Sequence, residues 1–330
     1  MSAAAPTVLL WSPLPAQAGR VHEALSALVE VRTIRAADEA DAIVRLAHAD
    51  AAVFVGAGSG YTAAIAQAAR AAPRLRWIQF ISTGIEGLET HGAPPGVVLS
   101  GIGDAGAAAV AEHAMALLLA LVRRLAPMVL ATQEGRWDRG VATGMRSLEG
   151  LQLGLVGCGG IGQATARRAQ AFGMRCVGIN RGGANPAPAL FERVLPLARR
   201  DEALAGCDAL VISLPLTPET RGVLAAPAWR ACRRGVVVVN VGRGATIDTA
   251  SLVAALDEGH ASGAGLDVTD PEPLPPGHPL WGRPDVVVSP HVAGGGSAAV
   301  TKRVCELVAE NARRFARGEP PRCPLAIPTP

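Results

Sequence analysis

A glycine-rich motif constrains the fold of this chain more than any other feature. It reads Gly157-Cys158-Gly159-Gly160-Ile161-Gly162 and fits the spacing Gly-x-Gly-x-x-Gly. An apolar segment, residues 151–156, precedes it, and a helix-compatible stretch, residues 163–172, follows it. In this context the glycines let the backbone approach a pyrophosphate at the N-terminus of a helix. The motif therefore predicts a strand–turn–helix unit that binds a dinucleotide.

The segments that follow predict a parallel sheet covered by helices on both faces. Six nearly continuous apolar runs alternate with helical or turn-rich stretches from residue 151 onward. Continuous rather than alternating hydrophobicity is what a strand buried on both faces requires. The predicted strands are residues 151–156, 176–179, 209–213, 235–241, 264–268 and 285–289.

The first hundred residues predict a second parallel sheet, and 330 residues are enough for about two domains. Short strands at 8–11, 52–55 and 77–81 alternate with helices at 16–29 and 38–47. Residues 107–122 are apolar on every side apart from Glu112 and His113. We expect this helix to lie between domains or at a subunit contact, with those two residues as satisfied interface groups rather than ligands.

Composition excludes several other functions. The 31 basic and 28 acidic side chains leave a net charge of +3, which is too balanced for nucleic-acid binding by charge alone. Lys302 is the only lysine and has no glycine-rich loop before it, which argues against a P-loop and a Schiff base. The six cysteines have no zinc-binding spacing, so we expect free thiols and no metal. Without a basic leader or a long apolar run, we expect a cytoplasmic protein that contacts no membrane.

The residues after the predicted strand at 176–179 bear on the choice of cofactor. An NAD-binding sheet normally presents Asp or Glu there to bind the ribose hydroxyls, but this chain has Asn180 followed by Arg181. A carboxylate repels a 2′-phosphate, whereas a neutral amide and a guanidinium can donate hydrogen bonds to one. We therefore predict a preference for NADP(H) over NAD(H). The alternative is that Arg181 is only a solvated surface residue and both cofactors are used.

Three polar residues follow predicted strands further along the chain. Arg243, Glu272 and His291 all fall at or beyond the carboxyl ends of apolar segments, the edge at which parallel sheets bind ligands. Reduction of a 2-keto acid needs an acid for the forming alkoxide, and histidine suits neutral pH. A carboxylate can orient that imidazole and raise its pKa, and a guanidinium can hold the substrate carboxylate. With no third ligand at useful spacing, a metal site is not expected.

Five motifs make the chain resemble the D-isomer-specific 2-hydroxyacid dehydrogenase family over nearly its whole length. They are Gly-Cys-Gly-Gly-Ile-Gly (157–162), Leu-Pro-Leu-Thr-Pro-Glu-Thr-Arg-Gly (214–222), Asn-Val-Gly-Arg-Gly (240–244), Gly-Leu-Asp-Val (265–268) and Ser-Pro-His-Val-Ala-Gly (289–294). The resemblance implies a Rossmann-type doubly wound sheet, residues 102–291, and a smaller flavodoxin-like α/β substrate domain formed by both chain ends, residues 1–101 and 292–330. It further implies catalysis in a cleft between them and a homodimer formed through the helix after residue 106.

The same resemblance assigns roles to residues. His291 would be the acid/base with Glu272 as its partner, Arg243 would bind substrate, and Asp267 would hold the nicotinamide carboxamide. The predicted cofactor-binding residues are Gly157, Gly159, Gly160, Ile161, Gly162, Asn180, Arg181, Leu214, Pro215, Thr220, Val241, Gly242, Arg243, Asp267, His291 and Gly294. Thr83, Gly84 and Ile85 resemble the loop that binds the substrate carboxylate, together with Arg243 and His291.

The sequence thus predicts an NADPH-preferring reductase of a small 2-keto acid such as glyoxylate or hydroxypyruvate, with the D-2-hydroxy acid as product. One alternative is an NAD-dependent dehydrogenase acting on another 2-hydroxy acid. A second, from another class, is a dinucleotide-sensing corepressor that binds short peptides on the same scaffold. Glu272 argues against a formate dehydrogenase, because the formate dehydrogenases of this superfamily pair the histidine with an amide.

Overall fold

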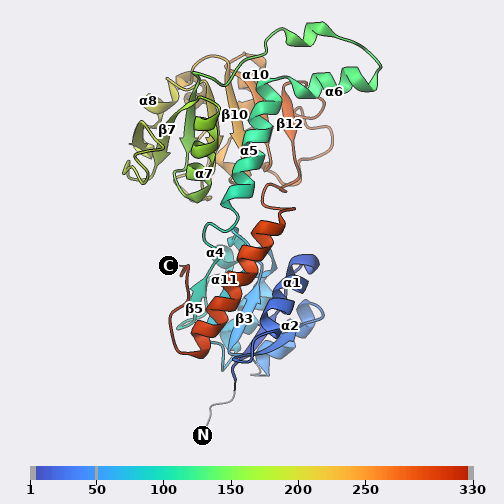
Figure 1. The fold of residues 1–330 in the computed structure, drawn as a ribbon, viewed down its shortest axis with the longest axis vertical. Coiled ribbons are helices and arrows are strands. Elements are labelled where there is room, and N and C mark those ends of the chain that lie inside the picture. Colours follow the sequence, from blue (N-terminus) through green and yellow to red (C-terminus); the bar gives the residue numbers. More distant parts are fainter. Residues whose placement is uncertain (1–4, 49–50, 326–330) are drawn as a thin grey trace. The chain divides into compact units, whose positions relative to one another are not determined.

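The computed structural model describes residues 5–48 and 51–325, which form two compact units (Figure 1). One unit contains the chain up to Gly106 and from Ser297 onward, and the other contains Ala107–Gly296. Each unit has its own parallel sheet, so the predicted α/β architecture with two sheets is confirmed. The units divide the chain at Gly106 and Gly296, whereas the resemblance implies divisions after residues 101 and 291.

The first unit is built on a five-stranded parallel sheet in the order β2-β1-β3-β4-β5, a flavodoxin-like order. Its strands are β1 (Thr7–Leu10), β2 (Arg32–Arg35), β3 (Val53–Gly56), β4 (Trp77–Phe80) and β5 (Val98–Ser100). The intervening helices are α1 (Pro15–Ser26), α2 (Glu39–Ala47), the 3₁₀ turn η1 (Gly58–Gly60), α3 (Ala63–Ala71) and α4 (Glu86–His91).

The C-terminal helix α11 (Ala298–Ala316) completes this first unit and packs against α1. A buried polar network fixes it there. The Asn311 amide donates to Gln79 Oε1 at 2.8 Å, and the same oxygen accepts the Ser100 hydroxyl at 2.7 Å. Because all three side chains are fully buried, each hydrogen bond compensates a desolvated group. Both ends of the chain therefore belong to one folded unit.

The second unit is built on a seven-stranded parallel sheet in the order β12-β11-β10-β9-β6-β7-β8. Its strands are β6 (Gln152–Val156), β7 (Arg175–Asn180), β8 (Arg193–Pro196), β9 (Ala209–Ile212), β10 (Val236–Asn240), β11 (Ala261–Leu266) and β12 (Val286–Val288). The direction of winding reverses between β6 and β9. In a doubly wound sheet the carboxyl ends of these two strands form the crevice that binds a ligand.

Helices cover both faces of the seven-stranded sheet, which explains the continuous apolar runs (Figure 1). In β10, Val237 and Val239 pack on the side of α5 and α7, whereas Val236 and Val238 pack on the side of α8, α9 and α10. The helices and 3₁₀ turns are α5 (Ala107–Val122), α6 (Leu125–Gln133), η2 (Arg139–Ala142), α7 (Gly160–Ala171), η3 (Leu197–Arg199), α8 (Arg200–Leu204), α9 (Ala226–Ala231), η4 (Gly244–Thr246) and α10 (Thr249–Asp257).

Helix α5 is apolar on most sides because it packs closely on the sheet of its own unit. A Cβ added to Gly265 of β11 would lie 2.9 Å from Leu117 Cβ, so the glycine permits this approach. The two polar residues of α5 also have partners in this unit: Glu112 pairs with Arg168 of α7 at 2.7 Å, and His113 contacts Ser289. Both have partners, as expected from the sequence, whereas the expected position of this helix between domains or at a subunit contact stays a prediction.

Among the described residues, no single helix is long and apolar enough to cross a membrane. Helices α5 and α6 would reach that length and apolarity only as a pair, and they meet at a bend of 69°.

Candidate active site

The glycine motif forms the turn between β6 and α7, and the structural reason for a glycine differs among its glycine positions. Gly157 has a φ of +114°, and a Cβ there would lie 2.8 Å from Ser213 Oγ. A Cβ at Gly162 would overlap the Gly157 carbonyl oxygen. At Gly159, by contrast, a Cβ would meet no described atom within 4 Å. The first and last glycines thus allow the turn to close, whereas the middle one borders open space.

This open space lies at the N-terminus of a helix. Helix α7 begins at Gly160, directly after Gly159, and no side chain caps its N-terminus. The first amides of a helix have no partner within the helix and carry partial positive charge, which attracts anions. Cys158 has a structural role instead, because burial raises the pKa of its thiol to about 11. The backbone of Gly159, Gly160 and Ile161 is therefore suited to hold the phosphates of a dinucleotide.

Asn180 and Arg181 follow β7, where the adenosine ribose of a dinucleotide would lie. The Asn180 side chain shapes the turn itself, since Oδ1 accepts from Gly183 N at 2.6 Å and Nδ2 donates to Ala184 O at 2.7 Å. Arg181 is exposed. Its charge helps to lower the pKa of Glu219, after the larger effects of hydrogen bonds from Thr217 and the backbone. Arg181 is thus the cation that this turn presents to solvent.

The loops after β9 and β10 follow the next two strands beyond β6 in the sheet order, at the same edge of the sheet. Thr220 stabilises its own loop, because its hydroxyl donates to Pro215 O at 2.7 Å and accepts from Thr217 N at 2.7 Å. The buried Gly242 lies against the same loop, and a Cβ there would be 2.8 Å from Leu214 O. Val241 precedes it and is also buried. These contacts bring the predicted residues of the two loops side by side.

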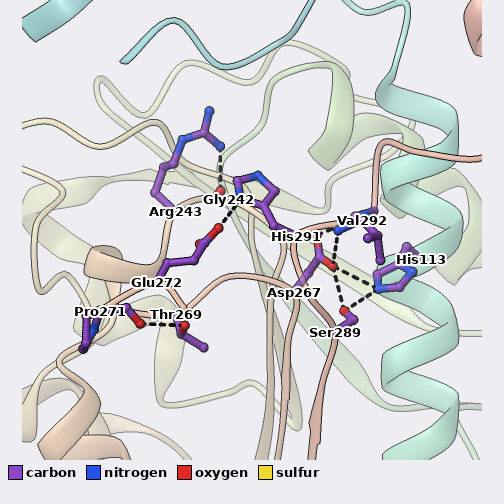
Figure 2. A network of polar contacts seen from close by, with 11 residues as sticks. His113, Gly242, Arg243, Asp267, Thr269, Pro271, Glu272, Ser289, His291 and Val292 are labelled. Atoms are coloured by element: carbon purple, nitrogen blue, oxygen red, sulfur yellow. Dashed lines mark hydrogen bonds and ion pairs between the residues drawn. The ribbon is translucent and has the colours of Figure 1, made fainter. Parts of the chain in front are cut away.

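Arg243 lies just beyond β10 in a turn that the buried Asn240 holds. The Asn240 amide donates to Arg243 O at 3.1 Å, and its oxygen accepts from Gly242 N at 3.0 Å. The Arg243 guanidinium donates to Gly242 O at 2.7 Å (Figure 2). Asn240 was not among the residues predicted for the site. The signal in the sequence was a polar residue at the end of a run of four valines.

Glu272 and His291 meet although they come from the segments after β11 and β12. His291 Nδ1 lies 2.7 Å from Glu272 Oε1, and the two side chains are 49% and 42% exposed (Figure 2). A carboxylate only accepts hydrogen bonds, so Nδ1 carries the proton and Nε2 is the atom that can gain or lose one. The backbone of His291 is left-handed, with a φ of +54°, which is uncommon for a residue other than glycine.

Asp267 holds the segment that carries His291. Its buried carboxylate accepts from the Val292 and Ala293 amides at 2.9 and 3.0 Å and from the Ser289 hydroxyl at 2.7 Å. These bonds give Asp267 an anchoring role that the sequence did not predict. Its assignment to the nicotinamide carboxamide stays a prediction, as does the cofactor role of Gly294, which follows this segment.

The segment Thr83-Gly84-Ile85 lies in the first unit, after β4. The Ser82 hydroxyl accepts from Gly58 N and donates to Gly84 O, both at 2.8 Å. A Cβ at Gly58 would overlap the Gly84 carbonyl oxygen, so the two loops touch closely. This packing fixes the loop, and its substrate-binding role stays a prediction.

No group of three or more His, Cys, Asp or Glu residues in the described ranges could hold a metal ion.

A doubly wound sheet with a glycine-rich turn after its first strand is typical of dinucleotide-binding proteins. Comparison with known proteins narrows this class. Residues 115–293 match the family model "D-isomer specific 2-hydroxyacid dehydrogenase, NAD binding domain". The chain belongs to the D-isomer-specific 2-hydroxyacid dehydrogenase family and is an NAD(P)-dependent 2-hydroxyacid dehydrogenase. The family resemblance in the sequence is thereby confirmed.

Individual relatives agree with this assignment. A glyoxylate reductase of Thermococcus kodakarensis is 35% identical over 258 residues, which cover 76% of each chain. A family protein of Aeromonas salmonicida subsp. salmonicida has a similar structure, with a TM-score of 0.82, 28% identity and coverage of 98% of this chain and 99% of that one. Another from Xanthobacter autotrophicus, solved with NADPH and MES, has a TM-score of 0.77 and 25% identity over 98% of each chain.

Proposed function

We propose that this enzyme reduces a small 2-keto acid, glyoxylate or hydroxypyruvate above all, to the D-2-hydroxy acid and prefers NADPH to NADH. The observation that carries the proposal is the 2.7 Å contact between His291 Nδ1 and Glu272 Oε1. It orients an imidazole as a proton donor at the sheet edge where dinucleotides bind. The 35% identity to a protein named glyoxylate reductase supports the choice of substrate class.

The proposed chemistry divides between cofactor and protein. Bound NADPH supplies the hydride that reaches C2 of the keto acid. His291 Nε2 gives a proton to the forming alkoxide, and Glu272 stabilises the imidazolium before that transfer. Arg243 binds the substrate carboxylate and polarises the adjacent carbonyl.

The two units would contribute differently to binding. We assign the dinucleotide to the unit Ala107–Gly296, and we assign part of substrate binding to Thr83-Gly84-Ile85 in the other unit. Backbone amides of this short loop would donate hydrogen bonds to the substrate carboxylate, alongside Arg243 and His291. Asp267 would accept a hydrogen bond from the nicotinamide carboxamide at whichever lone pair its protein donors leave.

The preference for NADPH rests on the turn after β7. Asn180 places no negative charge beside a 2′-phosphate, and the exposed Arg181 is a cation that can pair with it. The structure of the Xanthobacter relative contains NADPH, which supports the same choice.

The direct test is a steady-state comparison of 2-keto acids with each reduced cofactor. We expect kcat/KM to be highest for glyoxylate or hydroxypyruvate with NADPH, and at least about tenfold lower with NADH. A strong preference for NADH, or for oxidation of another 2-hydroxy acid with NAD, would contradict the proposal in favour of an NAD-dependent dehydrogenase. Absence of turnover with every pair would favour a dinucleotide-sensing binding protein.

We also propose that the enzyme is a homodimer. The family resemblance implied a contact through α5, but α5 packs on the sheet of its own unit, so we place the contact at α6 and the segment that follows it. These residues extend away from the sheet of their unit (Figure 1). Val129 and Leu130 are 55% and 52% exposed, and Trp137 is 90% exposed. Several exposed large apolar side chains within one short stretch of chain are typical of a protein contact. Sedimentation equilibrium should give a dimer that Val129→Asp dissociates, and a monomeric wild type would contradict this proposal.

A further inference from the structure

His113 belongs to a chain of polar contacts that ends at the segment carrying His291 (Figure 2). His113 Nε2 lies 2.8 Å from Ser289 Oγ, and that hydroxyl lies 2.7 Å from Asp267 Oδ1. We propose that His113 is a positioning residue that holds His291 through Ser289 and Asp267. This inference rests on the proposed role of His291 as the proton donor.

The direction of each hydrogen bond follows from which groups can donate. Asp267 accepts amide hydrogens at both carboxylate oxygens, from Val292 at Oδ1 and from Ala293 at Oδ2. The Ser289 hydroxyl has a single hydrogen, which it donates to Asp267 Oδ1. Its oxygen must then accept from His113, so His113 Nε2 carries a proton. Nε2 is also 3.4 Å from Asp267 Oδ1, so the imidazole lies beside the carboxylate.

Asp267 in turn binds three consecutive backbone N–H groups. The His291 amide donates to the Asp267 carbonyl at 2.8 Å, and the next two amides donate to its carboxylate. The backbone of His291 is left-handed, which is unfavourable for a residue with a Cβ and needs support from its surroundings. A shift of Asp267 would therefore move the imidazole relative to Glu272.

His113 acts on this anchor from outside the segment, through the Ser289 hydroxyl that donates to the Asp267 carboxylate. The Asp267 side chain is 1% exposed, so each hydrogen bond that it loses would leave a desolvated charge without compensation. The His113 ring is 26% exposed and comes from α5, which is packed on the sheet. Helix α5 thus adds to the loop amides a further link to the carboxylate, through Ser289.

Two substitutions of His113 separate the hydrogen bond from the bulk of the ring. His113→Leu fills the space without a donor, whereas the side-chain amide of His113→Gln can donate from nearly the position of Nε2. Glu112→Gln is the matched control, because the neighbouring Glu112 pairs with Arg168 and contacts none of these groups. Ser289→Ala removes the hydroxyl that links His113 to Asp267.

Two measurements are made on the full-length protein. The first is kcat and KM with the best keto acid, together with the dissociation constant of NADPH. The second is the NMR signal of the His291 imidazole in the cofactor-free protein, which has only seven histidines and allows assignment by His291→Asn. The NMR measurement requires no turnover, so it tests the positioning of His291 even if the proposed reaction fails.

We expect His113→Leu to lower kcat by about tenfold or more, to change the dissociation constant of NADPH less than about threefold, and to shift the His291 signal. His113→Gln should restore kcat to within about threefold of wild type and bring the His291 signal back to its wild-type position. Glu112→Gln should change neither kcat nor that signal. Ser289→Ala should shift the signal as His113→Leu does, which keeps the test valid if the leucine variant does not fold.

The inference is overturned if the wild type turns over and the leucine or alanine variant leaves both kcat and the His291 signal unchanged. A glutamine variant as impaired as the leucine variant would also overturn it, because the donated hydrogen bond would then not be the cause. An inactive wild type would instead contradict the proposed function, and the NMR shift would still decide the positioning role.

Discussion

Gly244 and Thr269 approach so closely that a Cβ on Gly244 would overlap the Thr269 carbonyl oxygen. The turn that carries Arg243 therefore lies directly against the segment that leads to Glu272. Gly244→Ala should force the two apart, lower the free energy of unfolding by about 1–3 kcal/mol and raise KM for the keto acid. Thermal unfolding and steady-state kinetics measure both effects. Gly19→Ala is the control, because its Cβ would meet only Arg35 Nη1, at 3.8 Å. Equal stability and KM in Gly244→Ala and wild type would contradict the packing argument.

The glycines of the phosphate loop should differ in what they affect. Gly159→Ala places its Cβ in open space, so the fold should tolerate it while the pyrophosphate is obstructed. We expect unchanged thermal stability and a dissociation constant for NADPH raised about tenfold or more. Gly162→Ala should instead lower stability, because its Cβ overlaps Gly157 O. If both variants lose stability to the same extent, Gly159 does not border the cofactor.

Arg181 should determine part of the preference for NADPH. Its side chain is exposed, so Arg181→Ala should leave the fold intact and remove a charge-assisted contact to the 2′-phosphate. We expect kcat/KM to fall about tenfold with NADPH and to stay within about twofold with NADH. Arg167→Ala, an exposed arginine on α7, is the control. A loss of the same size with both cofactors would mean that Arg181 does not contact the phosphate.

Burial of four thiols predicts lower stability at alkaline pH. It raises the pKa of Cys158 and Cys207 to about 11 and of Cys176 and Cys232 to about 12, from an ordinary value of 9.0. A pKa that is higher in the folded state gives stability that is present below the unfolded pKa and lost as pH rises toward the folded one. Denaturant unfolding should therefore show a falling free energy from about pH 9 upward.

Few other groups titrate in this range, since the chain has one lysine and one tyrosine. Below pH 9 the same four thiols should resist labelling in the native protein, whereas denaturant should expose all six. A free energy of unfolding that stays constant up to pH 11 would contradict this burial.

The sequence predicted the central strands of the second sheet because burial on both faces makes them continuously apolar. It did not predict β2, β5 or β8, which lie at sheet edges and read Arg-Thr-Ile-Arg, Val-Leu-Ser and Arg-Val-Leu-Pro. An edge strand is partly solvated and lacks the apolar run. The predicted strand at 264–268 also began too late, since β11 starts at Ala261 and Ser262 interrupts the pattern.

The supporting residues of the site could not be predicted in the same way. Arg243, Glu272 and His291 stand in motifs whose residue types suit the chemistry. Asn240, Ser289 and His113 act only through partners that the fold supplies, and His113 and Ser289 are 176 residues apart. A pattern within one segment carries no information about such a contact.

The central claim, that His291 donates the proton, is tested most directly by His291→Asn. Asparagine tolerates the left-handed backbone and can still donate to Glu272, but it cannot transfer a proton at neutral pH. We predict that kcat for the best keto acid falls by about 10²–10⁴-fold, while the dissociation constant of NADPH stays within about threefold of wild type. A variant whose kcat remains within tenfold of wild type would contradict the account.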